Sequence, residues 1–445
     1  MGNIKYLILS IFLIACIAGC KKGQKADYDD NFHPRIIDNN RVFESQNRII
    51  YEGQSAVYTG LAFSPTPQGK TKISWKVNGK EVSTDTTYTF TPTGGGQFEI
   101  KVEATYNGQT STRISNVLVS PTNYTPKSYT NIAMAYLTDA ATFANIDLPS
   151  VTHITFAGAR VPPTGVIDFT QASTNQNLDE IVARSHIGGV PVLLGIKGTL
   201  SPIDNWSIWE NKDFSTALLD PVKRASMAEV VIKYVTDHRL DGVDVMMTDF
   251  GHPEDIVINN LTATGQFVTL LRAGLPTKII TITATTNYLR SYYGAAVLAK
   301  LDWVNVHAYE DATVGPGSPV AQPSSYDYMV SCATNWAALI PKDKIVLGIP
   351  AFGLRFNQLD ENGNNQGWGS YDYMRYREIL AEYPDAYNHD NAPIKFGVFY
   401  NGKPLVDRKT AYIKTNGFKG AYLYAGDYDV KGPNSLMATI YQTLK

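Results

Sequence analysis

In the first third of the chain, apolar and polar residues alternate in short runs, as half-buried β-strands do. Residues 73–77 alternate in this way and are followed by Asn78-Gly79, a pair that favours a tight hairpin turn. Residues 98–104 repeat the pattern before the turn pair Asn107-Gly108. The pattern predicts an all-β domain over residues 35–121.

A tryptophan lies in the middle of the first alternating run. This residue, Trp75, resembles the core tryptophan of immunoglobulin-like and PKD-like β-sandwiches, and the length of the region fits one such domain. We expect the domain to act as a spacer, with carbohydrate binding as the alternative role.

Beyond a polar linker at residues 122–130, short apolar runs alternate with stretches of helical periodicity. Helices are predicted over residues 225–238, 371–382 and 435–444, each with apolar residues on one face. Eight strand–helix units predict a closed (β/α)8 barrel over residues 131–445. The eight predicted strands are residues 132–136, 153–157, 190–196, 242–247, 279–284, 303–307, 345–349 and 420–424.

Composition and motif spacing argue against several classes of function. The chain has 445 residues, 44% of them hydrophobic, and a net charge of -2, so no basic excess attracts nucleic acid. The seven histidines show no metal-ligand spacing, and no dinucleotide fingerprint occurs. We therefore expect no cofactor, no metal and no nucleic-acid partner.

The N-terminus carries a targeting pattern. A lysine precedes a short apolar run, and the run ends in Ile17-Ala18-Gly19-Cys20. The pattern resembles a bacterial lipoprotein signal over residues 1–20, in which Cys20 is lipidated, followed by a tether over residues 21–34. A plain secretory signal and a membrane anchor are the alternatives. The resemblance implies attachment to the bacterial outer membrane, at the cell surface or facing the periplasm.

Cysteine usage agrees with a single anchor and no disulfide. Cys16 lies in the segment that would be removed and Cys20 would carry lipid, which leaves only Cys332. We expect Cys332 to be a buried, small apolar side chain.

Residues 240–249 read Leu-Asp-Gly-Val-Asp-Val-Met-Met-Thr-Asp. This stretch resembles the signature strand of glycoside hydrolase family 18, the chitinases and endo-N-acetylglucosaminidases. Asp241 and Asp244 match the first two aspartates of that signature. Met246 stands where the third aspartate belongs, and Thr248 stands where the catalytic glutamate belongs.

Other strands support the resemblance in the order that the family has them. Residues 131–136 resemble the family's first strand, and residues 190–198 keep part of the third strand's Ser-x-Gly-Gly ending. Residues 304–310, 345–353 and 420–429 resemble the sixth, seventh and eighth strands. The resemblance implies a (β/α)8 barrel with a small insertion between the seventh and eighth strands.

We expect that Met246 and Thr248, at two positions that are acidic in the family, remove the acid–base groups that glycosidic cleavage needs. A glycosidic oxygen leaves slowly unless an acid protonates it in the transition state. The resemblance implies that the missing glutamate is this acid, and that the substrate's acetamide attacks in place of a second carboxylate. Neither Met246 nor Thr248 can exchange protons at neutral pH. We therefore expect no catalytic residue at these positions, although Asp249, Glu254 or Glu310 could supply a displaced acid.

The same resemblance implies a carbohydrate-binding face at the carboxyl ends of the strands. Tyr424 replaces the family's tryptophan and could stack on a sugar ring, while Tyr309 would bind an acetamide carbonyl. For Asp244 and Asp427, the alternative is that each satisfies buried hydrogen bonds within the barrel. The predicted binding residues are Asp244, Tyr309, Glu310, Tyr424 and Asp427.

Three functions remain open at this stage. The leading hypothesis is a surface-anchored, non-catalytic protein that binds N-acetylglucosamine-containing glycans. The alternatives are an active endo-acting glycoside hydrolase with a displaced acid, and a protein-interaction scaffold, because one barrel fold hosts many functions. Related lipoproteins often work with outer-membrane glycan-uptake proteins, which are therefore candidate partners.

Overall fold

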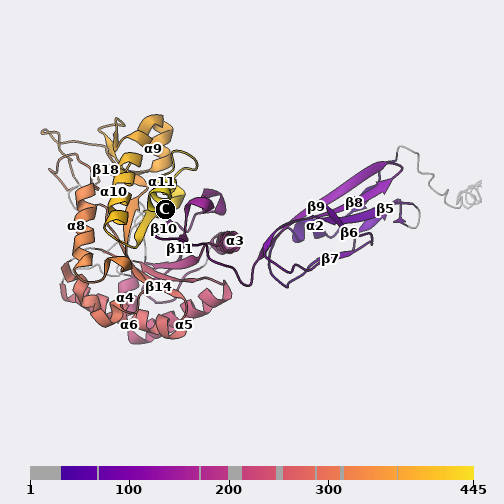
Figure 1. Ribbon diagram of the computed structural model, residues 1–445, viewed down its shortest axis with the longest axis horizontal. Helices are drawn as coiled ribbons and strands as arrows, with labels where there is room; N and C mark the ends of the chain where they lie inside the picture. The colour runs from indigo at the N-terminus through magenta and orange to yellow at the C-terminus, as the bar shows by residue number, and fades with distance from the viewer. Residues whose placement is uncertain are drawn as a thin grey trace, which may run out of the picture. The chain divides into compact units, whose positions relative to one another are not determined.

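The computed structural model describes residues 32–67, 70–169, 172–198, 213–246, 254–285, 288–310, 315–367 and 369–445. The chain divides between Val119 and Ser120 into two compact units, which are described separately (Figure 1). The predicted signal, Cys20 and the tether up to residue 31 lie outside the described residues, so lipidation stays a prediction.

The first unit consists of antiparallel β-sheets. Its largest sheet has five strands in the order β2-β9-β8-β5-β6, and two further sheets pair β1 with β4 and β3 with β7. The all-β prediction for this region is therefore confirmed. The elements are β1 (Arg35–Ile37), α2 (Val42–Ser45), β2 (Ile49–Tyr51), β3 (Ala56–Tyr58), β4 (Ala62–Ser64), β5 (Lys72–Val77), β6 (Lys80–Ser83), β7 (Tyr88–Phe90), β8 (Gly96–Tyr106) and β9 (Gln109–Ser120).

Trp75 lies at the centre of the core of this unit. Its ring is fully buried and stacks on Phe43 and Tyr88, with ring centroids 5.9 and 5.4 Å away. Its indole N–H donates to the carbonyl of Asp85, so the one polar atom of the ring is satisfied. The hairpin at Asn78-Gly79 is present, and both residues have positive φ as its tight turn requires.

The second unit is a closed barrel of eight parallel strands in the order β10-β11-β12-β13-β14-β15-β16-β21. All eight predicted strands occur within a few residues of their expected bounds. The strands are β10 (Ile132–Leu137), β11 (His153–Arg160), β12 (Val192–Lys197), β13 (Gly242–Met246), β14 (Ile279–Ala284), β15 (Trp303–Val306), β16 (Ile345–Pro350) and β21 (Gly420–Tyr424).

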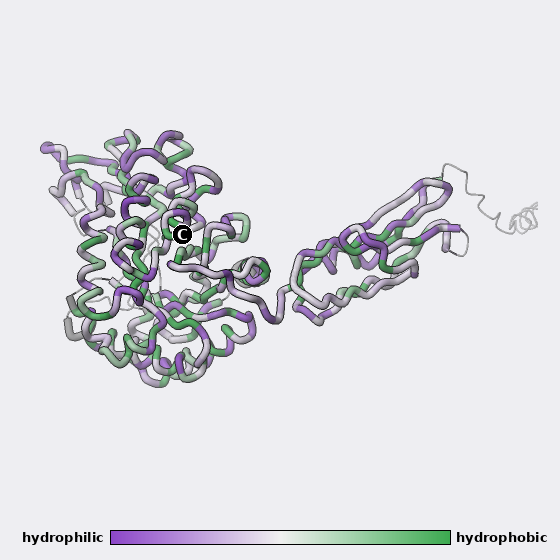
Figure 2. The backbone as a smooth tube through the Cα atoms, viewed as in Figure 1, coloured by the Kyte–Doolittle hydropathy of each residue, from purple (hydrophilic) through white to green (hydrophobic). Residues whose placement is uncertain are grey.

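Helices surround the barrel strands (Figure 1). Hydrophobic and hydrophilic residues alternate along them, as amphipathic helices require (Figure 2). The helices are α3 (Ala172–Ile187), α4 (Asp213–Leu219), α5 (Pro221–Asp237), α6 (Glu254–Gly274), α7 (Ala295–Leu298), α8 (Tyr326–Ala337), α9 (Tyr376–Glu382), α10 (Lys403–Thr415) and α11 (Leu436–Leu444). Short 3-10 segments are η2 (Phe143–Asn145), η3 (Leu148–Ser150), η4 (Tyr288–Tyr293), η5 (Lys342–Lys344), η6 (Pro384–Asn388) and η7 (Gly426–Tyr428).

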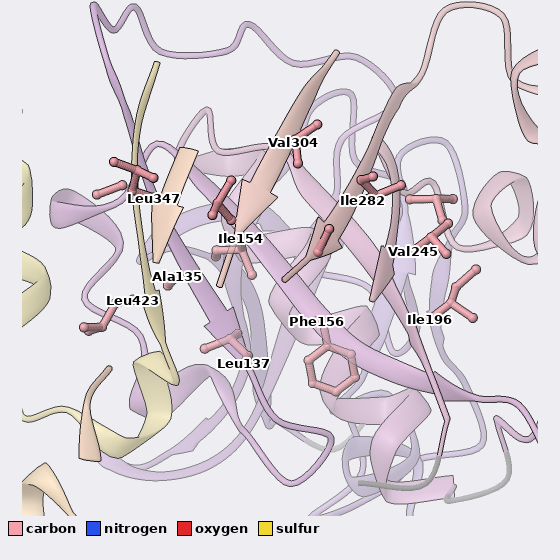
Figure 3. Close-up of a cluster of buried hydrophobic side chains, with 14 of the residues drawn as sticks. Ala135, Leu137, Ile154, Phe156, Ile196, Val245, Ile282, Val304, Leu347 and Leu423 are labelled. Carbon is pink, nitrogen blue, oxygen red and sulfur yellow. The ribbon is translucent and has the colours of Figure 1, made fainter. Parts of the chain in front are cut away.

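Each barrel strand is buried on both faces, so its side chains divide between two cores. One set points outward and packs under the helices, and Figure 3 shows members of this set from all eight strands. The other set fills the barrel interior and carries most of the polar groups of the strands. On β11, for example, Ile154 and Phe156 belong to the outer set, whereas Thr155 and Ala157 belong to the inner set.

The insertion between β16 and β21 forms a four-stranded antiparallel sheet in the order β18-β17-β20-β19. Its strands are β17 (Phe352–Phe356), β18 (Tyr371–Arg375), β19 (Asn391–Ala392) and β20 (Val398–Phe399).

The helix predicted over residues 371–382 is wrong in its first part, because Tyr371–Arg375 is strand β18 and only Tyr376–Glu382 is helical. The strand pairs with β17 along its whole length. The guanidinium of Arg355 on β17 donates two hydrogen bonds, of 2.7 and 2.8 Å, to the carboxylate of Asp372 on β18. Aromatic residues fit such a paired surface, and the tertiary pairing overrides the helical pattern. Trp368 lies outside the described residues.

Cys332 is buried on α8, as predicted. Among the helices that the structure describes, none is long and apolar enough to cross a membrane.

Candidate functional site

Side chains from the carboxyl ends of the barrel strands converge at one end of the barrel, here called the mouth. In (β/α)8 barrels this end carries the ligand site. The register pairs Gly195 of β12 with Asp244 of β13, so Met246 lies one interior layer nearer the mouth than Asp244. The site therefore has two levels, an interior layer around Asp244 and a rim layer around Met246.

The interior layer is built on Asp244, which is fully buried. One carboxylate oxygen accepts from the hydroxyl of Thr281 at 2.5 Å and from the amide of Asn305 at 2.9 Å. The other accepts from Thr283 at 2.6 Å and from Tyr136 at 2.8 Å. Burial raises the pKa of Asp244, and these four hydrogen bonds oppose the rise. The structure thus places Asp244 just beneath the mouth, with its oxygens occupied by the barrel itself.

Met246 fills the space on the mouth side of the hydrogen bonds around Asp244. Its side chain is buried, and its sulfur lies 3.0 Å from the point that a Cβ on Gly195 would occupy. The glycine therefore makes room for the methionine, which packs in the apolar cluster of the barrel interior. Thr248 and Asp249 lie outside the described residues, and so does the side chain of Glu254.

Three tyrosines close the other side of the mouth. Tyr309 and Tyr424 lie with ring centroids 6.4 Å apart and nearly parallel planes, and Tyr422 meets Tyr309 edge-on. A Cβ on Gly348 would come within 2.5 to 2.6 Å of Tyr422 and Tyr309, so this strand position needs a glycine. Burial raises the pKa of Tyr309 and of Tyr422, which keeps both phenols neutral.

These rings form a packed floor instead of an open platform. Tyr424 is 2% exposed and Tyr309 is 1% exposed. Stacking of a sugar on Tyr424, as expected from the sequence, therefore requires neighbouring groups to move. The binding roles of both residues stay predictions.

Glu310 lies at the edge of this floor. Its φ of 60° is in the left-handed region, and its backbone N–H donates to the hydroxyl of Ser324 at 3.2 Å. One carboxylate oxygen is 3.4 Å from Nε2 of His307. Burial raises the pKa of Glu310 to about 7, against a hydrogen bond from Tyr373 that lowers it. Near neutral pH a large fraction of Glu310 is therefore protonated.

Asp427 accepts hydrogen bonds from Thr138, the residue that follows β10. One of its carboxylate oxygens accepts from the backbone N–H of Thr138 at 3.0 Å, and the other accepts from the Thr138 hydroxyl at 2.7 Å. Burial raises the pKa of Asp427. The structure thus gives Asp427 a structural role at the end of β10, and its predicted contact with a glycan is untested.

Lys197 is the functional candidate that sequence reasoning missed. It ends β12, its side chain is 5% exposed, and its Nζ is 3.0 Å from a carboxylate oxygen of Asp139. Burial lowers the pKa of Lys197, while Asp139 opposes that shift. The sequence signal for this residue was a lysine at the end of the otherwise apolar run Val192–Lys197. Lysine is rarely buried unless its charge is paired.

A closed (β/α)8 barrel with polar and aromatic side chains gathered at its mouth is the architecture of a large class of enzymes and binding proteins. The family described as glycosyl hydrolases family 18 matches residues 124–429. The chain belongs to this family, which confirms the resemblance drawn from the strand motifs.

Relatives named as a chitinase or as chitinase-like are about a quarter identical to the chain over the aligned residues. Chitinase 1 of Aphanocladium album is 24% identical over 361 residues, covering 68% of this chain and 82% of that protein. A chitinase-like effector of Moniliophthora perniciosa is 27% identical over 257 residues, covering 52% of this chain and 54% of the effector.

Solved structures share the barrel fold. A chitinase from Bacteroides thetaiotaomicron aligns with a TM-score of 0.58 at 22% identity, covering 71% of this chain and 97% of that one. A chitinase-like agglutinin from Robinia pseudoacacia aligns with a TM-score of 0.55 at 18% identity, covering 71% of this chain and all of the agglutinin. At these identities the likeness concerns the fold alone.

Proposed function

We propose that this protein binds N-acetylglucosamine-containing glycans at the barrel mouth without cleaving them. The observation that carries the proposal is the replacement of both acidic positions of the signature strand by Met246 and Thr248. Without a proton donor, the glycosidic oxygen remains a poor leaving group even in a well-fitted complex.

The shape of the barrel mouth supports a binding function. Asp244 and its four partners hold the interior layer beneath the mouth, and the packed rings of Tyr309 and Tyr424 form its floor. Similar proteins include two that are named a chitinase-like effector and a chitinase-like agglutinin, and these names agree with the proposal.

The anchored location is part of the same proposal. Lipidation of Cys20 would hold the protein on the bacterial outer membrane, with residues 21–34 as a tether. The N-terminal antiparallel domain would then act as a spacer, and outer-membrane glycan-uptake proteins would be the partners that receive the captured glycan.

Calorimetry with chitotetraose and with an N-glycan tests the proposal directly. Binding heat with at least one of the two, and unchanged glycan recovered afterwards, supports a non-catalytic binder. The absence of heat with both glycans would favour the scaffold alternative.

A hydrolase with a displaced acid is the second candidate, because Glu310 is buried at the mouth with a pKa near neutrality. Turnover of the same glycans should be measured for the natural protein, for Glu310→Gln and for Asp249→Asn. Glu361→Gln, at an exposed loop position, is the matched control. Turnover that either of the first two substitutions abolishes and the control preserves would establish this candidate over the binder.

A further inference from the structure

The strongest unassigned feature of the barrel mouth is the buried ammonium group of Lys197. Lys197 and Met246 occupy adjacent register positions at the ends of β12 and β13, because Ile196 pairs with Val245. The lysine therefore lies in the rim layer, beside the position from which the signature acid has been lost.

Among the residues that the structure describes, the hydrogen bonding of Lys197 is incomplete. An ammonium group has three N–H donors, and within the described ranges only one of them has a partner, the carboxylate of Asp139. Burying a charge is costly unless its hydrogen bonds are made. Two donors at the mouth therefore remain for an acceptor that the chain itself does not supply among those residues.

Charges of both signs surround the ammonium. Arg160, the register partner of Lys197 on β11, lowers the pKa of Lys197, whereas Asp139 and Asp427 raise it. The two oxygens of Asp427 accept hydrogen bonds from Thr138. Asp139 is the only carboxylate hydrogen-bonded to the lysine in the described part of the chain, and its side chain is 50% exposed.

We propose that Lys197 selects glycans that carry a carboxylate on the sugar next to N-acetylglucosamine. This inference rests on the proposed glycan-binding function and assigns its ligand class. The ligand carboxylate would accept from the two remaining donors of Lys197, as charge-assisted hydrogen bonds. Asp139, being half-exposed, can turn toward solvent as the ligand enters.

Asp139 has a predictable effect in this arrangement. It holds the ammonium in place in the absence of ligand, but its negative charge opposes the arrival of a second carboxylate. Asp139→Asn should therefore tighten binding of an anionic glycan and leave binding of a neutral glycan unchanged.

Calorimetry on the full chain with three probes tests the proposal. The probes are a hyaluronan tetrasaccharide, which alternates N-acetylglucosamine with glucuronate, its neutral methyl ester, and neutral chitotetraose. The variants are Lys197→Met, which removes the charge at similar length, and Lys197→Arg, which keeps it. Lys233→Met on the outer helix α5 is the control, because that side chain is 75% exposed.

The expected result is that hyaluronan binds about 10- to 100-fold more tightly than its ester, the range of a charge-assisted hydrogen bond. Lys197→Met should abolish this ratio, Lys197→Arg should keep most of it, and the control should leave it unchanged. Equal affinity for hyaluronan and its ester, or tighter binding of chitotetraose than of hyaluronan, would overturn the anionic ligand class alone. Failure of all three probes would overturn glycan binding itself.

Discussion

The two layers of the barrel mouth differ in what they have kept. In the interior layer, Asp244 makes the full set of four hydrogen bonds that a buried carboxylate needs. In the rim layer, one strand position nearer the mouth, Met246 stands in place of a carboxylate and packs against Gly195. The interior layer keeps a complete set of polar contacts, whereas the rim layer has an apolar side chain at position 246.

The comparison distinguishes residues that stabilise the barrel from residues that would act on a substrate. The interior carboxylate cannot be lost without leaving several buried donors unsatisfied. Met246 in the rim layer packs in an apolar cluster, so the hydrogen bonds of the interior layer do not depend on its side chain. A barrel can therefore lose its acid while its shape persists.

Restoring the acids should have the largest effect. The double substitution Met246→Asp and Thr248→Glu returns both carboxylates to the signature strand. Because a positioned acid contributes about 10²- to 10⁴-fold to such reactions, the double variant should cleave chitotetraose at about that factor above the background rate without protein, whereas the natural protein should not exceed the background. Product analysis by mass spectrometry measures it. An inactive double variant that still binds the glycan would show that losses extend beyond the rim strand.

Removing the interior carboxylate should cost the most stability. Asp244→Ala leaves Tyr136, Thr281, Thr283 and Asn305 without their acceptor, so the free energy of unfolding of the barrel should fall by about 3–5 kcal/mol. Urea unfolding followed by barrel fluorescence measures the change. Asp237→Ala, at a half-exposed position on α5, is the control and should shift the value by less than about 0.5 kcal/mol. A cost below about 1 kcal/mol for Asp244→Ala would contradict the supporting role of the layer.

Glu310 should make stability depend on pH. Its pKa is about 7 in the folded protein against an ordinary value of 4.5, so the folded state binds the proton more tightly. The stabilising contribution is complete below pH 4.5 and is lost as the pH rises through about 7. Glu310→Gln should remove this dependence, and the free energy of unfolding relative to the natural protein should improve by about 1–3 kcal/mol between pH 4.5 and pH 8. Parallel unfolding curves for the two proteins across this range would contradict the burial of a protonatable Glu310.

Met246→Leu should have the smallest effect. If the rim position now serves packing alone, a side chain of similar volume should cost less than about 1.5 kcal/mol. Glycan affinity should stay within about twofold by calorimetry. A loss of affinity greater than tenfold would mean that Met246 contacts the ligand, and the contrast between the two layers would need revision.

Much of the fold could be predicted because its signals are local. Alternation and turn pairs gave the hairpin around Asn78-Gly79, and apolar runs gave the eight barrel strands. Strand β18 (Tyr371–Arg375) could not be predicted, since it forms by pairing with β17 (Phe352–Phe356), an earlier segment of the insertion. Its identity depends on a partner strand that the local pattern does not contain.

The strand motifs predicted where the candidate residues lie, but not their contacts. The structure has Asp244, Tyr309, Glu310, Tyr424 and Asp427 at or beneath the mouth, and their binding roles stay predictions. Sequence could not tell that Thr138 occupies both oxygens of Asp427, or that Tyr424 is packed beneath its neighbours. These facts depend on which side chains meet across the barrel, and the same applies to the pairing of Lys197 with Asp139.

Prolonged incubation of the natural protein with chitotetraose, with binding verified by calorimetry and products followed by mass spectrometry, tests the central claim most directly. The account predicts saturable binding and intact tetrasaccharide at every time point. Shorter oligosaccharides that accumulate in proportion to protein concentration would contradict it.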